Sequence, residues 1–325
     1  MICLCCGKEI REDAHTDEIA NQWHRSCIKR FFGTKTMPEI DISEDVLHNL
    51  ANMNTQNGYT VPGVQKKISL HLENHNNTSR LTLVNYPTGY ILKPQTEDYR
   101  AMPESEYLVM SMAQKAGINT VPFAMIKDFK RENFAYITKR IDRVMPVKNG
   151  EEMKMLAMED FCQLDGKLTE NKYIGSYERC GKIISKYSSQ PGIDKSEFFL
   201  RLVFCYVSGN SDMHLKNFSL IENPNRPGEY SLSRRYDLLP VNVILPADTE
   251  ETALTLNGKK KNLRKKDFMA LAFNMKLDEK IATRLLKKIV SMKDIFLKMT
   301  EQSLIPNDMK ENFKILISKR CEMLK

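Results

Sequence analysis

The sequence lacks the features of membrane, secreted and repeat proteins. None of its apolar runs approaches the ~20 residues of a bilayer-spanning helix, and its start turns polar too quickly for a signal peptide. It has no internal repeat and no low-complexity tract, which excludes a solenoid architecture. We therefore expect a cytoplasmic protein that acts without a membrane. Its 325 residues suffice for two lobes with substantial cores.

Cysteine is present, but not in the pattern of a disulfide framework. Of the 8 cysteines, Cys162, Cys180, Cys205 and Cys321 are dispersed through helical patterns, where a free thiol behaves as a small buried apolar residue. A chain of this length without a secretory segment neither needs nor favours disulfides. The remaining four cysteines lie close to the N-terminus.

Those N-terminal cysteines are spaced as metal ligands. Cys3 and Cys6 form a C-x2-C pair, His24 and Cys27 form an H-x2-C pair, and 17 residues separate the two pairs. Three thiolates and an imidazole at this spacing favour a closed tetrahedral zinc site, structural rather than catalytic. Cys5 could replace Cys3 as a ligand, and a cluster of unligated thiols is the alternative to metal binding.

Positive charge exceeds negative charge, and the formal net charge is +8. The densest basic run, Lys259 to Lys266, could follow the phosphates of a nucleic acid. A solvated loop leading into a helix is the more common structure for such a run. We therefore expect nucleic acid to be reached only indirectly, through a partner protein.

Two kinds of periodicity divide the chain. Short β-rich runs with one helix among them, residues 108–115, occupy residues 58–140, whereas helical periodicity dominates from about residue 156. This order predicts an α+β protein with a small β-rich N-terminal lobe and a mostly helical C-terminal lobe. The expected strands are residues 67–72, 80–84, 89–92, 123–129 and 134–138. The expected later helices are residues 177–187, 195–207, 264–274, 277–292 and 307–324.

The segment from Gly209 to Asn217, G-N-S-D-M-H-L-K-N, combines the residue types of a phosphoryl-transfer site. Asp212 and Asn217 are five residues apart, and Asp237 follows twenty residues later. An ionised carboxylate can take up a hydroxyl proton, while an amide and a second carboxylate are hard oxygen ligands for Mg²⁺. These residues in this order are typical of the catalytic loop of a protein kinase.

Segments before this loop supply candidates for the remaining parts. Lys93 ends an expected strand, as does the phosphate-contacting lysine of a kinase, and Glu106 at the start of the next helix could pair with it. A solvated lysine and an acid that merely favours a helix N-terminus are the alternatives. Residues 139–143 could form a hinge that reads adenine, or an exposed charged turn. A glycine-containing loop with polar donors could hold phosphates, or could be a plain turn between strands. This loop consists of Val61, Pro62, Gly63, Val64, Gln65, Lys66 and Lys67.

Taken together, these segments resemble the HipA-like serine/threonine kinases, the toxins of bacterial toxin–antitoxin modules. The resemblance covers roughly residues 58–270, with seven motifs in order. They are V-P-G-V-Q-x-K (61–67), Y-I-L-K-P (90–94), E-x-E-Y (104–107), K-R-I-D-R (139–143), M-E-D-F-C-Q (158–163), G-N-S-D-M-H-L-K-N (209–217) and R-Y-D-L-L-P (235–240). A later L-T-L-N-G-K-K at 254–260 also fits.

The resemblance implies a role for each matched position. Asp212 would be the catalytic base, Asn217 and Asp237 the Mg²⁺ ligands, and His214 a neighbour of the metal site that supports it or contacts phosphate. Lys93 would contact the ATP phosphates. The phosphate loop would be residues 61–67, and Lys139, Arg140 and Ile141 would be the hinge.

Three departures from the family pattern bear on regulation and partners. Where family members autophosphorylate a serine in the phosphate loop, this chain has Thr60, so self-inactivation would use a threonine. Lys139 stands where an acidic residue is usual. Longer members carry an extra N-terminal subdomain before the loop. This chain resembles the short form, in which that subdomain is absent or encoded as a separate protein, and we therefore expect a partner chain.

The sequence therefore predicts an ATP- and Mg²⁺-dependent serine/threonine kinase acting as a HipA-like toxin. Its substrate would be a protein, such as an aminoacyl-tRNA synthetase, and its partner an antitoxin or a separately encoded subdomain. A non-catalytic kinase-like scaffold and a small-molecule or lipid kinase are the alternatives. We expect a Cys/His knuckle in residues 1–36, an N-terminal lobe in 37–140 and a helical C-terminal lobe in 141–325.

Overall fold

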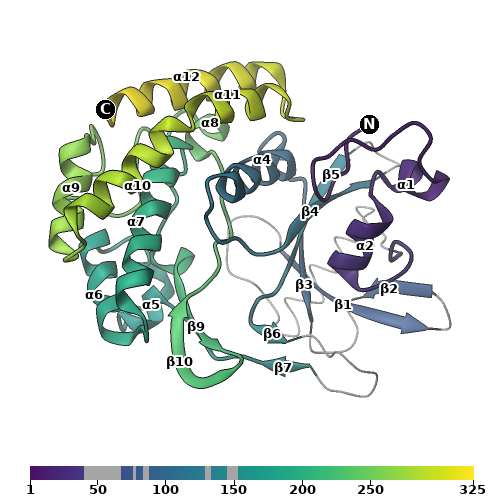
Figure 1. Cartoon of the computed structure of the whole chain (residues 1–325), viewed down its shortest axis with the longest axis horizontal. Coiled ribbons are helices and arrows are strands. Elements are labelled where there is room, and N and C mark those ends of the chain that lie inside the picture. The colour runs from purple at the N-terminus through teal and green to yellow at the C-terminus, as the bar shows by residue number, and fades with distance from the viewer. Residues whose placement is uncertain (40–66, 76–77, 83–87, 129–132, 145–152) are drawn as a thin grey trace. The chain divides into compact units, whose positions relative to one another are not determined.

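The computed structural model describes residues 1–39, 67–75, 78–82, 88–128, 133–144 and 153–325 (Figure 1). The chain divides into two compact units, residues 1–107 with 121–153 and residues 108–120 with 154–325. Over the described ranges, no helix has both the length and the apolar character needed to cross a membrane.

The first unit is built on an antiparallel sheet of five strands in the order β2-β1-β3-β5-β4. The strands are β1 (Ile68–His75), β2 (Thr78–Thr82), β3 (Tyr90–Pro94), β4 (Phe123–Asp128) and β5 (Asn133–Lys139). Each falls on a β-rich run of the sequence, so those five strand predictions are confirmed. A short strand, β6 (Arg143–Val144), follows β5.

The N-terminal segment packs on one face of this sheet. It contains α1 (Thr16–Asn21) and α2 (Arg25–Phe32), and α2 lies against the strands in Figure 1. Side chains alternate between the faces of a strand, so Tyr90 and Leu92 of β3 meet this segment, whereas Lys93 lies on the other face. The shared apolar core includes Leu4, Ile10, Trp23, Ile28, Phe31, Phe32, Ile68, Leu70, Ala124, Ala135 and Ile137.

The second unit is mostly helical around one buried helix. α4 (Met102–Lys115) begins in the first unit and ends in the second, and α7 (Pro191–Val207) is buried at every residue from Phe198 to Val207. A helix buried over this stretch needs neighbours on every side, and α7 packs against α6 (Tyr177–Tyr187), α10 (Glu279–Ser291) and α12 (Asn307–Met323). The remaining helices are α5 (Phe161–Leu164), α8 (Val241–Ile244), α9 (Lys265–Asn274) and α11 (Lys293–Glu301), with 3₁₀ turns η1 (Thr169–Asn171) and η2 (Leu215–Asn217).

A small antiparallel sheet of this unit, in the order β10-β9-β8, flanks the Gly209–Asn217 segment. It consists of β8 (Met158–Asp160), β9 (Ser219–Asn223) and β10 (Arg226–Leu232); β7 (Lys154–Met155) precedes it. A turn at residues 224–225 joins β9 to β10, and the register of β10 shifts between Arg226 and Tyr230. A bulge accommodates Pro227 and Gly228 there, because neither residue supports a regular ladder.

Candidate functional site

The Gly209–Asn217 segment leaves α7 through a tight C-cap. The N–H of Gly209 donates to the carbonyl of Tyr206, and the N–H of Asn210 donates to the carbonyl of Cys205, which is the Schellman pattern. Gly209 has φ +71°, and a Cβ there would lie 3.2 Å from the Leu316 side chain. A glycine at this point lets the buried helix end abruptly and sets the start of the loop.

Within the loop, Asp212 is accessible and oriented. Its side chain is 47% exposed, and the hydroxyl of Tyr173 donates to its Oδ1 at 2.7 Å. The buried His214 packs edge-on against the Tyr173 ring, with centroids 5.0 Å apart, and its Nε2 lies 4.0 Å from Oδ2 of Asp212. A carboxylate that is fixed in direction yet open to solvent can act as a general base.

Asn217 is tied to the backbone of the same loop. Its amide Nδ2 donates to the backbone carbonyl of Asp212 at 2.7 Å. The amide nitrogen is thereby engaged, so Oδ1 is the atom that Asn217 can offer to a metal ion. The two loop residues are thus coupled through one hydrogen bond.

Asp237 lies near the loop in an unusual backbone conformation. Its φ is +59°, a left-handed value that few residues other than glycine adopt. Arg235, only 1% exposed, donates to the backbone carbonyl of Asn217 and, at 3.4 Å, to that of Asp237. This arginine therefore connects the two candidate magnesium ligands through their backbones. Strained backbone of this kind is common at functional sites.

Two further contacts fix the loop to its surroundings. Lys216 forms a 2.8 Å ion pair with Asp160, which also caps α5 by accepting from the Gln163 N–H at 2.9 Å. The Ser211 hydroxyl donates to Asp248 at 2.6 Å. Asp160 and Gln163 belong to the M-E-D-F-C-Q motif, so this motif caps α5 and anchors the loop through Lys216.

In the first unit, Lys93 and Glu106 form a buried ion pair. Their Nζ and Oε1 atoms are 2.6 Å apart, and the side chains are 5% and 0% exposed. The Tyr136 ring lies 5.4 Å from the Lys93 ammonium. Glu104, the other acid of the motif, is not the partner, and burial raises the pKa of its carboxyl group. The expected pairing of Lys93 with Glu106 is therefore present.

The segment expected to be a hinge follows β5. Lys139 packs its ammonium against the Phe31 ring, 5.6 Å from the centroid, and burial lowers its pKa. Arg140 donates through two nitrogens to Asp142, at 3.1 and 2.8 Å. The backbone N–H groups of Lys139 and Arg140 already donate to carbonyls within this unit. Adenine recognition here would therefore depend on carbonyl groups or on Ile141.

The expected phosphate loop and regulatory threonine, residues 60–66, lie outside the described residues. Lys67, the last position of the loop motif, directly precedes β1. The roles of these residues stay predictions.

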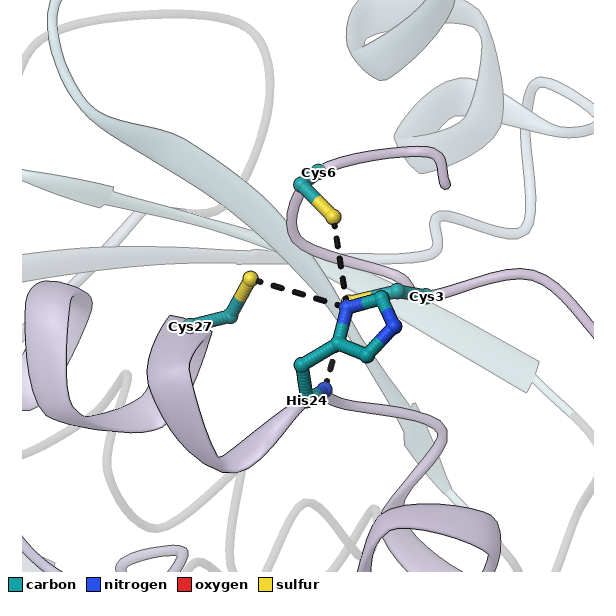
Figure 2. A group of neighbouring side chains, drawn as sticks. All are labelled: Cys3, Cys6, His24 and Cys27. Carbon is teal, nitrogen blue, oxygen red and sulfur yellow. Dashed lines mark hydrogen bonds between the residues drawn. The ribbon is translucent and has the colours of Figure 1, made fainter. Parts of the chain in front are cut away.

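At the N-terminus, the structure brings together the four residues expected to bind zinc. The ligand atoms of Cys3, Cys6, His24 and Cys27 lie within 4.8 Å of one another (Figure 2). Cys5 is not in this group, so it does not take the place of Cys3. Burial raises the pKa values of the Cys3 and Cys27 thiols, and that of Cys5 to about 11.

Sequence reasoning assigned no role to Tyr173 or Arg235. Arg235 stands next to Tyr236-Asp237 in the R-Y-D-L-L-P motif, and this position is the only feature of the sequence that links it to the site. Tyr173 lies in a polar segment without periodicity, 39 residues before Asp212 in the chain, so nothing local pointed to it. Both act through contacts that form only on folding.

Comparison with known proteins gives matches of three kinds. A family model described as the HipA-like C-terminal domain matches residues 59–295. A putative kinase of Haemophilus influenzae is 28% identical over 190 residues, covering 57% of this chain and 54% of that protein. The putative kinase Y4dM of Sinorhizobium fredii is 31% identical over 238 residues, covering 69% and 55%. The chain spans about half the length of the curated relatives it matches.

Two solved structures share the fold. Shewanella oneidensis HipA, in a complex with HipB and operator DNA, gives a TM-score of 0.67 at 19% identity, covering 82% of this chain and 65% of that chain. The Helicobacter pylori proinflammatory kinase CtkA gives 0.54 at 16% identity, covering 81% and 90%. The expected α+β, protein-kinase-like fold of the HipA type is confirmed.

Proposed function

Because the chain belongs to the HipA-like C-terminal domain family, we propose that it is an ATP- and Mg²⁺-dependent serine/threonine protein kinase. It would transfer the γ-phosphoryl group of ATP to a protein hydroxyl. The observation that carries this proposal is the Gly209–Asn217 loop, where an accessible Asp212 is held by Tyr173 and coupled to Asn217. Two relatives named putative kinases and the kinase-like fold support it.

In the proposed mechanism, Asp212 orients the substrate hydroxyl and accepts its proton as phosphoryl transfer proceeds. Its 47% exposure leaves the carboxylate within reach of a protein side chain. The Tyr173 hydroxyl keeps the carboxylate pointed in one direction, so little ordering is required when substrate binds. His214 supports this arrangement by packing against the Tyr173 ring.

The residues proposed as magnesium ligands have suitable chemistry. Asn217 would bind through Oδ1 and Asp237 through its carboxylate, both of them hard oxygen donors. Mg²⁺ held there would neutralise charge on the ATP phosphates. Arg235 would keep the two ligands at a fixed separation, since it donates to both of their backbone carbonyls.

Lys93 would bind the ATP phosphates, with Glu106 orienting its ammonium group. Val61 to Lys67 would form the phosphate loop, and Lys139 to Ile141 the hinge. Phosphorylation of Thr60 would add roughly two negative charges to a loop that must hold phosphates, and would so inactivate the kinase. The proposed organisation is a knuckle in residues 1–36, an N-terminal lobe in 37–140 and a C-terminal lobe in 141–325.

The proposed biological role is that of a toxin controlled by an antitoxin. The Shewanella oneidensis neighbour was solved with HipB and operator DNA. By analogy, this chain would associate with an antitoxin or a separately encoded subdomain and would reach DNA only through it. Its target would be a component of translation, such as an aminoacyl-tRNA synthetase.

The proposal is tested by incubating the purified protein with ATP and Mg²⁺, alone and in a cell lysate, and locating phosphosites by mass spectrometry. The wild type should phosphorylate a protein serine or threonine, whereas Asp212→Asn should be slower by about 10²–10⁴-fold. Glu279→Gln, at an exposed position of α10, is the matched control and should behave as the wild type. Full activity of Asp212→Asn would refute the assigned base.

The same assay separates the competing functions. Phosphate on a small molecule or lipid but on no protein would replace the protein-kinase assignment. ATP binding without any transfer would favour a kinase-like scaffold. Phosphate on Thr60 in the wild type, with higher activity in Thr60→Ala, would support self-inactivation.

A further inference from the structure

The N-terminal segment gathers four metal-ligating side chains at one point. Figure 2 shows Cys3 and Cys6 entering from the N-terminal turn and His24 and Cys27 from the start of α2, all pointing toward one another. Gly7, with φ +69°, closes the N-terminal turn, and its N–H donates to the Cys3 carbonyl at 2.9 Å. Two sequence-distant pairs thus meet, each held by its own local structure.

The distances between these side chains fit a tetrahedral ion. Zinc binds sulfur at ~2.3 Å and imidazole nitrogen at ~2.0 Å, which places neighbouring ligand atoms ~3.5–3.8 Å apart. Nδ1 of His24 lies 3.4 Å from the Cys6 sulfur and 3.9 Å from the Cys27 sulfur. Hydrogen bonding alone explains this convergence poorly, because Nδ1 can share one hydrogen and not two.

The other ring nitrogen of His24 fixes the tautomer that metal binding requires. Nε2 lies 3.1 Å from the backbone carbonyl of Glu9, which can only accept a hydrogen bond. Nε2 must therefore carry the hydrogen, and in the neutral ring Nδ1 keeps its lone pair toward the sulfurs. Metal-bound histidines are commonly oriented by such a bond from the second nitrogen.

Nearby donors partly offset the cost that burial adds to a thiolate at Cys3 and Cys27. The backbone N–H of His24 donates to the Cys3 sulfur at 3.5 Å, and Nη2 of Arg30 donates to the Cys27 sulfur at 3.5 Å. Cys27 lies in the first turn of α2, where the helix dipole stabilises negative charge. A divalent cation with three thiolates carries a net negative charge, which Arg30 offsets.

We propose that Cys3, Cys6, His24 and Cys27 bind a structural Zn²⁺ ion that holds residues 1–33 against the five-stranded sheet. Four protein ligands leave no position for a substrate or a reactive water, so this ion takes no part in catalysis. Cys5 is a neighbour and not a ligand, because it lies outside the group of converging atoms. The proposal does not depend on kinase activity.

Metal content of the full chain, reconstituted with zinc, is the first test. The wild type should retain about one zinc ion per chain, and X-ray absorption should show three sulfur ligands at ~2.3 Å and one nitrogen at ~2.0 Å. Cys3→Ser and His24→Ala should lose the ion, whereas His24→Cys should keep it as a four-thiolate site. The matched controls Cys5→Ser and Cys162→Ser should also keep it. No bound zinc in the folded wild type, or equal loss in Cys5→Ser and Cys3→Ser, would overturn the proposal.

The single tryptophan of the chain gives a second test that is local to this segment. Trp23 is fully buried, and its Nε1 donates to the Met125 carbonyl of the sheet at 3.0 Å. Removal of zinc by a chelator should shift its emission to longer wavelength, and zinc but not magnesium should reverse the shift. An unchanged emission spectrum after complete metal removal would show that the ion does not hold the segment in place.

Discussion

Lys93 and Glu106 in the first unit are buried and neutralise each other at 2.6 Å, whereas Asp212 in the second unit is half exposed and contacts a tyrosine hydroxyl. The first arrangement removes two charges from water, so each depends on the other for its stability. The second leaves one charge solvated and merely directs it. A substitution in the buried pair should therefore destabilise the fold, whereas a substitution of the accessible Asp212 carboxylate should leave the fold stable.

The largest expected effect is at Asp212, where activity should fall while the stability of the fold stays the same. Asp212→Asn should reduce phosphoryl transfer by about 10²–10⁴-fold, because the amide cannot accept a proton. Its free energy of unfolding should stay within about 0.5 kcal/mol of the wild type, as for other exposed substitutions. Urea denaturation alongside the phosphorylation assay separates the two quantities. If Asp212→Asn destabilised the fold as much as Lys93→Met, the proposed difference between the exposed carboxylate and the buried ion pair would be wrong.

At the buried Lys93–Glu106 pair, by contrast, a substitution should lower the stability of the fold. Lys93→Met should lower the free energy of unfolding by about 3–5 kcal/mol, because the Glu106 carboxylate stays buried without the ammonium. The double variant Lys93→Met/Glu106→Gln should recover much of that loss, since neither charge of the pair remains. Urea midpoints of both single variants and the double variant form a complete cycle. Additive losses would mean that the two residues do not act as a pair.

A smaller effect is expected from the tyrosine that directs Asp212. Tyr173→Phe removes one hydrogen bond and keeps the ring that packs on His214. A net loss of about 1 kcal/mol, or about fivefold in kcat/KM, should follow. Tyr187→Phe, at an exposed position at the end of α6, is a control that should change nothing. An effect as large as that of Asp212→Asn would make Tyr173 itself a catalytic residue.

The smallest effect is a pH dependence at Asp142. Burial alone would raise the pKa of its carboxyl group, but hydrogen bonds and charge from Arg140 and Arg143 hold it below the usual value. Its stabilisation is therefore complete above the unfolded pKa of about 3.9 and is lost as the pH falls through the lower folded value.

Asp142→Asn should accordingly cost about 0.5–1 kcal/mol at pH near 7, and the difference from the wild type should shrink below pH of about 4. Urea unfolding at several pH values measures this. Asp98→Asn, at an exposed position of the same unit, should show no such convergence. A difference that grows in acid would contradict the lowered pKa.

Helices with a clear amphipathic period were predictable, and those with polar ends were less so. α6 runs over Tyr177–Tyr187, as its sequence period indicates, and Ser176 caps it by accepting from the Arg179 N–H. α7 begins at Pro191, four residues before the expected start at Lys195. A proline is favourable at the first helical position, but the polar first turn gives no periodic signal.

The residues of the candidate site that lie at a characteristic spacing in the chain, such as Asp212 and Asn217, could be named from the sequence. The order of the motifs predicted that Glu106 pairs with Lys93, and the structure shows this pair. The alternative, acids that merely favour the helix N-terminus, stayed open because only folding shows which side of the helix faces Lys93. The same limit applied to Arg235, whose buried contacts with the Asn217 and Asp237 carbonyls join separate segments.

The sequence by itself determined the short-range features: the two chelating pairs, the spacing of Asp212 from Asn217, and the change from strand-rich to helical periodicity. These depend on a few neighbouring residues, and local backbone geometry sets them. Only the tertiary structure decided that Glu106 pairs with Lys93, that Tyr173 directs Asp212, and that Cys3 rather than Cys5 joins His24. Such choices depend on which buried faces meet, and that follows from packing of the whole unit rather than from any local pattern.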